Sequence, residues 1–133
     1  MATYKEIKGV TVQTLDSDPV VNVGSFSSGG DLNTARTQGG NNLGTYTATL
    51  FMSGATGSPS WPTAKTEVEQ WDGSSWTEIA EVNTGRYRGQ AAGVSNSDTL
   101  FYSGSLTPGT AQAKTEQWDG TSWTEVGDLA QAR

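Results

Sequence analysis

The stretch that decides the fold is residues 66–79, which read Thr-Glu-Val-Glu-Gln-Trp-Asp-Gly-Ser-Ser-Trp-Thr-Glu-Ile. It returns at residues 115–126 as Thr-Glu-Gln-Trp-Asp-Gly-Thr-Ser-Trp-Thr-Glu-Val. Trp71 and Trp118 are 47 residues apart, and so are Trp76 and Trp123. A repeat of this length predicts stacked structural units rather than one closed domain.

Each copy predicts a β-hairpin, because Thr, Val and Trp favour strands and an Asp-Gly pair favours a tight turn. Two registers are open. A loop of Asp72 and Gly73 alone places Trp71 opposite Ser74, whereas a loop from Asp72 to Ser75 places Trp71 opposite Trp76. Side chains alternate along a strand with period two, so both registers put the two tryptophans on one face.

Composition favours a β protein and narrows the function classes. The 133 residues include 17 glycines, and hydrophobic residues make up 33%, which fits short strands joined by tight turns. The chain has no cysteine and no histidine, which excludes disulfides, zinc thiolate sites, cysteine nucleophiles and the commonest general base. The net charge of −6 argues against a nucleic-acid partner, and no apolar run is long enough for membrane insertion. Almost every Asp and Glu repeats with the hairpin or linker or lies in a turn, so we predict no enzyme activity, no cofactor and no metal site.

Three linkers set the boundaries of the units. Residues 31–36, 81–86 and 128–133 are versions of one connection, and each ends in an arginine, namely Arg36, Arg86 and Arg133. Phe26 precedes Arg36 by ten residues, as Trp76 precedes Arg86. Residues 24–36 are therefore predicted to be a partial unit, and residues 37–86 and 87–133 two complete four-stranded units. We call the three connections the N-terminal, central and C-terminal linkers.

Residues 1–23 do not belong to the repeat and are predicted to form a separate N-terminal β element. Its short predicted strands carry their own alternating apolar side chains. The candidate docking residues of this element are Tyr4, Ile7, Val10, Val12 and Leu15. Because they lie outside the repeat, we expect them to contact another protein.

The repeated unit resembles the kelch motif of β-propellers. That motif has an Arg near its start, an apolar strand ending in paired small residues, and an aromatic residue before a turn with Trp beyond it. Here these are Arg36, residues 50–54, Trp71 and Trp76, and then Arg86, residues 100–104, Trp118 and Trp123. The chain departs from the motif with Ser-Gly in place of Gly-Gly and Trp-Asp-Gly in place of a Tyr-Asp pair.

The amino-acid sequence of the repeats is more similar still to kelch-like proteins of marine bacteriophages. Their repeats resemble residues 116–126 followed by an Asn-Thr-Ala-Arg linker, and they begin with a short leader that resembles residues 1–5. The resemblance covers residues 24–133 well and residues 1–19 loosely. It implies an all-β fold of kelch-like propeller blades, two complete and one partial, behind the N-terminal element. The motif is specific for fold and weak for function, since propellers carry unrelated activities.

The resemblance also implies a function. Our first hypothesis is a structural virion protein, a tail-fibre or tail-appendage component that docks on other virion proteins by its N-terminus and displays blades for assembly or host-receptor binding. The alternative is a lectin-like, carbohydrate-binding propeller that recognises a host-surface glycan. An enzyme of the propeller hydrolase or oxidase kind is the least favoured, since histidine and cysteine are absent.

Each candidate site has two interpretations. The tryptophans Trp71, Trp76, Trp118 and Trp123 are either sugar platforms or packing between units, and their recurrence at fixed places favours packing. The three linker arginines either bind an acidic ligand or tie strands together by hydrogen bonds to carbonyl groups, and we favour the second. Trp61 lies outside the repeat, in a proline-containing loop, and is the better candidate for ligand binding.

The number of units predicts assembly. Two complete units and part of another do not close a propeller, because known rings have about four to eight blades. We therefore expect a homo-oligomer, and favour a trimer with six blades.

Overall fold

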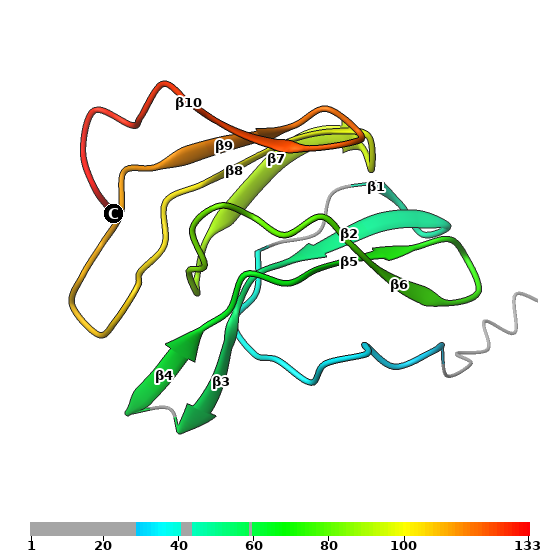
Figure 1. Cartoon of the computed structure of the whole chain (residues 1–133), viewed down its shortest axis with the longest axis horizontal. Helices are drawn as coiled ribbons and strands as arrows, with labels where there is room; N and C mark the ends of the chain where they lie inside the picture. Colours follow the sequence, from blue (N-terminus) through cyan, green and yellow to red (C-terminus); the bar gives the residue numbers. More distant parts are fainter. Residues whose placement is uncertain (1–28, 41–43, 59) are drawn as a thin grey trace, which may run out of the picture.

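The computed structural model describes residues 29–40, 44–58 and 60–133. The N-terminal element, with Tyr4, Ile7, Val10, Val12 and Leu15, and the beginning of the predicted partial unit, with Phe26, lie outside the described residues. The described part is all-β and consists of antiparallel sheets, none of them closed (Figure 1). It contains no helix that is long and apolar enough to cross a membrane.

The first sheet has four strands in the order β1-β2-β5-β6, each antiparallel to its neighbour. These strands are β1 (Gly44–Thr45), β2 (Ala48–Met52), β5 (Val68–Trp71) and β6 (Trp76–Ile79). Between β2 and β5 the chain forms a separate two-stranded hairpin of β3 (Ala55–Ser58) and β4 (Trp61–Ala64). The sequence predicted a loop at Trp61, which was wrong for the backbone. A two-stranded ribbon tolerates Pro62 because its strands have free edges.

The second sheet repeats this arrangement in the order β10-β9-β8-β7. Its strands are β7 (Gln90–Ser95), β8 (Asp98–Tyr102), β9 (Thr115–Trp118) and β10 (Trp123–Val126). An isolated bridge between Ser105 and Ala111 takes the place of the β3–β4 hairpin, and the bridge between Tyr87 and Ser105 repeats the one between Thr37 and Ala55. The sequence repeat therefore folds twice as a four-stranded antiparallel sheet.

The hairpin turn is the longer of the two predicted registers. Trp71 pairs directly with Trp76, and Trp118 with Trp123, so each loop has four residues. The Asp72 carboxylate organises its loop by accepting hydrogen bonds from the amides of Ser74 and Ser75, both at 2.8 Å. These bonds, the one from Ser75 first, lower the pKa of Asp72 to about 2.

The core lies between the two sheets. We call the side of each sheet that carries its two tryptophans the front face, and the opposite side the back face. Leu50, Met52 and Val68 line the back face of the first sheet, and they pack with the front face of the second sheet and with Val82 of the central linker. The front-face residues of this core are Phe101, Trp118 and Trp123. Figure 1 shows the two sheets lying one against the other.

Candidate functional site

A buried ion pair joins the N-terminal linker, and another the central linker, to the sheet that follows it. Arg36 Nη2 lies 2.9 Å from Glu69 Oε1, and Arg86 Nη1 lies 3.0 Å from Glu116 Oε1. Glu69 is on β5 and Glu116 is the equivalent residue of β9. At most 1% of any of these side chains is exposed. Moving a charged side chain from water into the interior costs several kcal/mol. A partner of opposite charge at this distance offsets that cost, so a buried charge needs one.

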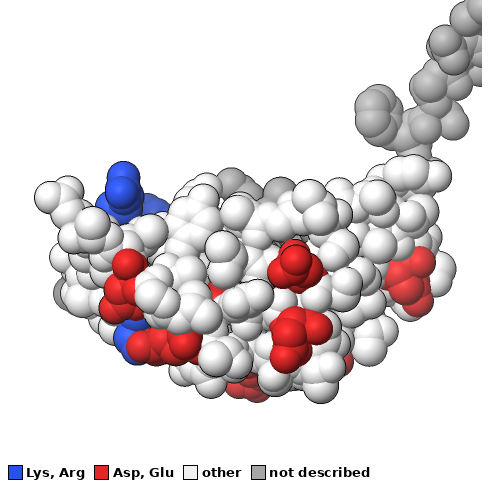
Figure 2. All heavy atoms as spheres, turned by 90° about the horizontal axis from the view of Figure 1, so that it is seen from above, with Lys and Arg blue, Asp and Glu red and all other residues white. Residues whose placement is uncertain are grey.

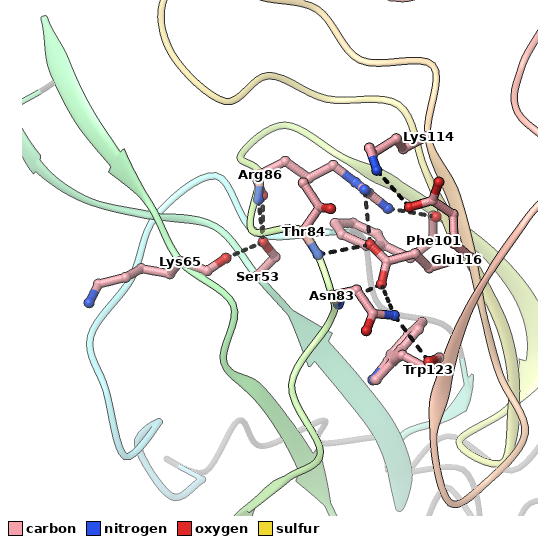
Figure 3. Close-up of polar contacts among 10 residues, drawn as sticks. Ser53, Lys65, Asn83, Thr84, Arg86, Phe101, Lys114, Glu116 and Trp123 are labelled. Carbon is pink, nitrogen blue, oxygen red and sulfur yellow. Dashed lines mark hydrogen bonds and ion pairs between the residues drawn. The ribbon is translucent and has the colours of Figure 1, made fainter.

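Each glutamate also accepts hydrogen bonds from the linker backbone and from an asparagine. In the second unit, Glu116 Oε2 accepts from the Asn83 amide at 2.6 Å and from Asn83 Nδ2 at 3.1 Å, and Oε1 accepts from the Thr84 amide at 3.2 Å (Figure 3). Asn83 Nδ2 also donates to the Trp123 carbonyl. We call this set of contacts the glutamate clamp.

The same clamp is present in the first unit. Glu69 Oε2 accepts from the Asn33 amide at 2.7 Å and from Asn33 Nδ2 at 3.0 Å, and Glu69 Oε1 accepts from the Thr34 amide at 3.4 Å. Asn33 Nδ2 donates to the Trp76 carbonyl. The linker sequence Asn-Thr-x-Arg is therefore the part of the chain that each sheet binds through one carboxylate.

The guanidinium groups stack on phenylalanine rings. Arg86 lies 4.3 Å from the centre of the Phe101 ring and donates from Nη2 to the Phe101 carbonyl at 2.9 Å. Arg36 lies 5.3 Å from the centre of the Phe51 ring. Burial lowers the pKa of Arg86 and the Glu116 carboxylate opposes this shift. An arginine nevertheless stays charged, so the ion pair is retained.

These contacts show what the sequence interpretation missed. It favoured hydrogen bonds from the arginines to carbonyl groups, and Arg86 makes one such bond, but the main partner of Arg36 and of Arg86 is a glutamate of this chain. The available signal was the Glu-Gln-Trp triplet in both repeats, since strand alternation puts Glu69 and Glu116 on the tryptophan face.

Arg133 stands at the equivalent place in the C-terminal linker. Its carbonyl accepts from the Gly104 amide at 3.1 Å, as the Arg86 carbonyl accepts from the Gly54 amide at 3.2 Å. The Arg133 side chain is exposed, and within the described ranges no carboxylate pairs with it. The structure thus brings Arg36 and Arg86 into clamps and leaves Arg133 outside one.

The four repeated tryptophans differ in burial. Trp118 and Trp123 are 3% and 7% exposed, and their ring centres are 5.3 Å apart. The rings of Trp71 and Trp76 are similarly close, with centres 5.4 Å apart, but both residues are half-buried. The indole of Trp123 donates to the Ala80 carbonyl and that of Trp76 to the Gly30 carbonyl.

A hollow of about 590 Å³ lies on the front face of the first sheet. The N-terminal linker forms most of its wall and Trp76 forms the rest; the lining residues are Gly30, Asp31, Leu32, Asn33, Ala35, Arg36 and Trp76. Both apolar and hydrogen-bonding groups face the hollow, and this combination is typical of sites that bind a ligand or a partner. This hollow is the candidate binding site of the described structure.

The other candidate residues lie apart from the hollow. The Trp61 backbone pairs with Ser58 in the β3–β4 hairpin, and its side chain is outside what the structure describes.

Acidic side chains are spread over the surface shown in Figure 2, and Lys and Arg gather near one end of it. Among the described residues, no three acidic side chains are grouped so that they could hold a metal ion.

Comparison with protein-family models and with curated proteins gave no match. The likeness to kelch-like repeats therefore rests on the motif residues of this chain, such as Arg86, Trp118 and Trp123.

Proposed function

We propose that this chain is a structural component of a bacteriophage particle, a tail-fibre or tail-appendage protein. In this proposal residues 1–23 dock on other virion proteins, and the repeated sheets are kelch-like propeller blades displayed for assembly or host-receptor binding. The observation that carries the proposal is the glutamate clamp, which recurs with the same atoms in both units and joins each sheet to the linker before it.

The clamp supports a scaffold because it fixes geometry without using an exposed reactive group. In the second unit its charges and the Phe101 ring lie in the interior, where they hold the two units in one orientation. Further support for repeated units comes from the four antiparallel strands of each sheet and from the arginine that precedes each of them. A displayed array of such units suits a fibre or appendage of a particle.

Mass spectrometry of purified particles tests the proposal. Peptides from residues 37–133 should be found in density-purified virions, at a constant ratio to known coat proteins across successive purification steps. Abundant host proteins of the lysate serve as the control, because they should decline at each step. A chain that is abundant in the infected lysate and lost from the particles would refute the virion role.

The alternative is a carbohydrate-binding protein, and the hollow beside Trp76 favours it. The half-buried indole, Asn33 and the surrounding linker offer an aromatic surface next to hydrogen-bonding groups. Trp61 on the β3–β4 hairpin is the second aromatic candidate. A glycan array with the parent chain and with Trp61→Ala distinguishes the two surfaces, since only binding at the hairpin is lost in that variant.

A further inference from the structure

Equivalent side chains of the two sheets differ systematically in burial. On the back faces, Leu50 is 0% exposed whereas its counterpart Leu100 is 37% exposed. On the front faces the difference is reversed: Phe101 is fully buried and its counterpart Phe51 is half-buried. The reason is that the back of the first sheet covers the front of the second. The described residues leave the front of the first sheet and the back of the second without such a cover.

The three linkers differ in the same way. Figure 3 shows the central linker held from both sides, by the glutamate clamp on one and by Ser53 on the other. On the Ser53 side, the Val82 amide donates to the Thr66 carbonyl at 3.1 Å, and Ser53 Oγ donates to the Arg86 carbonyl at 2.7 Å. We call these the back-side bonds.

Each terminal linker has one half of this arrangement. The N-terminal linker has the glutamate clamp, but within the described residues the Leu32 amide and the Arg36 carbonyl have no back-side partner. The C-terminal linker has the back-side bonds, from the Leu129 amide to the Ala113 carbonyl at 2.9 Å and from the Gly104 amide to Arg133. It has no clamp, and Ala130 and Gln131 stand where the other linkers have Asn and Thr.

We propose that copies of this chain associate head to tail, with the N-terminal linker of one copy replacing the C-terminal linker of the next. The N-terminal linker of one copy takes the place of the C-terminal linker on the second sheet of another copy, which displaces residues 128–133. The Leu32 amide then binds the Ala113 carbonyl, and the Arg36 carbonyl binds the Gly104 amide. The back face of the second sheet thereby packs on the front face of the first, as the two sheets of one chain do. This inference does not depend on the virion role.

A second copy is the occupant that the exposed faces fit. Inside the chain, Leu50 and Met52 already pack on a front face made of Phe101 and two tryptophans. The exposed back face offers Leu100, and the exposed front face offers Phe51 with Trp71 and Trp76. The hollow beside Trp76 corresponds to the place between Val82 and Trp123 that the first sheet fills within the chain. Head-to-tail joints of this kind either close into rings or extend into filaments.

The joint between copies is looser than the joint within the chain. Gly40 lies against Phe101 so closely that a Cβ there would be 2.8 Å from the ring. The counterpart of Gly40 is Gln90, whose Cβ would meet Phe51 of the next copy. The N-terminal linker also has Ala35 where the central linker has Gly85, and a Cβ at Gly85 would lie 2.6 Å from the Lys65 carbonyl oxygen, so the incoming linker must shift at this point. Gln90→Gly removes the first of these two obstacles and should tighten the association.

Light scattering coupled to size exclusion tests the joint with three matched variants of the full chain. Leu100→Glu changes the back face, Leu32→Glu the front face, and Pro108→Glu an exposed position in the loop between β8 and β9 as a control. Each of the first two should weaken association on the order of tenfold to a hundredfold. Pro108→Glu should not, and Gln90→Gly should strengthen association. Near-ultraviolet circular dichroism verifies that each variant is folded.

Mixing separates a head-to-tail joint from a symmetric one. A mixture of Leu100→Glu and Leu32→Glu should give one-to-one dimers, because each variant keeps the face that the other lacks. The chain has no cysteine, so a short bis-maleimide should also link Leu32→Cys to Ala113→Cys in a mixture and link neither variant to itself. A parent chain that stays monomeric at high concentration, as it would if residues 1–28 covered the front face, overturns the proposal. Linking within a single variant, or association unchanged in Leu100→Glu and Leu32→Glu, overturns it equally.

Discussion

Replacing Glu116 by glutamine tests the clamp most directly, because the side chain keeps its shape and loses its charge. Glu116 is 0% exposed, and it accepts from the Asn83 amide, Asn83 Nδ2 and the Thr84 amide as well as pairing with Arg86. The substitution leaves the Arg86 guanidinium buried without a counter-charge. Removing one partner of a buried pair costs about 3–5 kcal/mol. We therefore expect Glu116→Gln to lower the free energy of unfolding by that amount.

Urea unfolding followed by tryptophan fluorescence measures the effect. A loss of about 4 kcal/mol at a slope of about 2 kcal/mol per M shifts the urea midpoint by roughly 2 M. Glu125→Gln is the matched control, because Glu125 is half exposed and pairs with Lys114 at the surface, so its midpoint should not move measurably.

A double variant identifies the cause of the loss. Arg86→Met together with Glu116→Gln removes both charges and keeps an oxygen for the Asn83 amide, so it should recover part of the stability. The reasoning is refuted if Glu116→Gln unfolds at the same urea concentration as the parent chain. It also fails if the double variant is no more stable than Glu116→Gln alone, since the unpaired charge is then not the cause.

Further predictions concern the tryptophans, the turn and the N-terminus. Trp123→Ala should cost about 3–5 kcal/mol, and Trp76→Ala clearly less, because Trp76 is only half-buried; equal shifts in melting temperature would contradict this. The pKa of Asp72 is lowered to about 2, so the stabilising effect of its carboxylate is present above pH 3.8 and is lost as the pH falls towards 2. The melting temperature should therefore fall less steeply over this pH range in Asp72→Asn than in the parent chain. An identical pH profile would contradict the role of this carboxylate in the turn. Deleting residues 1–19 should leave the repeats folded but absent from particles, and normal incorporation of that variant would exclude a docking role.

The sequence predicted the elements that depend on local chemistry. Two tryptophans on one face and a turn at Asp72 follow from strand alternation and from the Asp-Gly pair. The choice of register did not follow, because it depends on the Asp72 carboxylate reaching the amides of Ser74 and Ser75. Those bonds favour the four-residue loop over the two-residue loop that Asp-Gly usually makes.

The clamp was harder to predict because it joins residues that are far apart in the chain. Glu69 and Glu116 occupy strands in which a charged residue is normally expected to face solvent, and only the arrival of an arginine and an asparagine from a linker makes their burial favourable. The repeat indicated that these residues matter together, but not that they meet. The β3–β4 hairpin was missed for another reason, since Pro62 argues against a strand when its edge position is unknown.

The spacing between the clamp residues differs between the two units. Asn33 and Glu69 are 36 residues apart, whereas Asn83 and Glu116 are 33 apart, although both pairs have the same contacts. The extra length lies between the second and third strands of the unit, where one copy has the β3–β4 hairpin and the other a loop with isolated bridges. Insertions and deletions at this point therefore leave the framework undisturbed. Natural variation, or an engineered graft, can change the tip of a unit there without altering how successive units are joined.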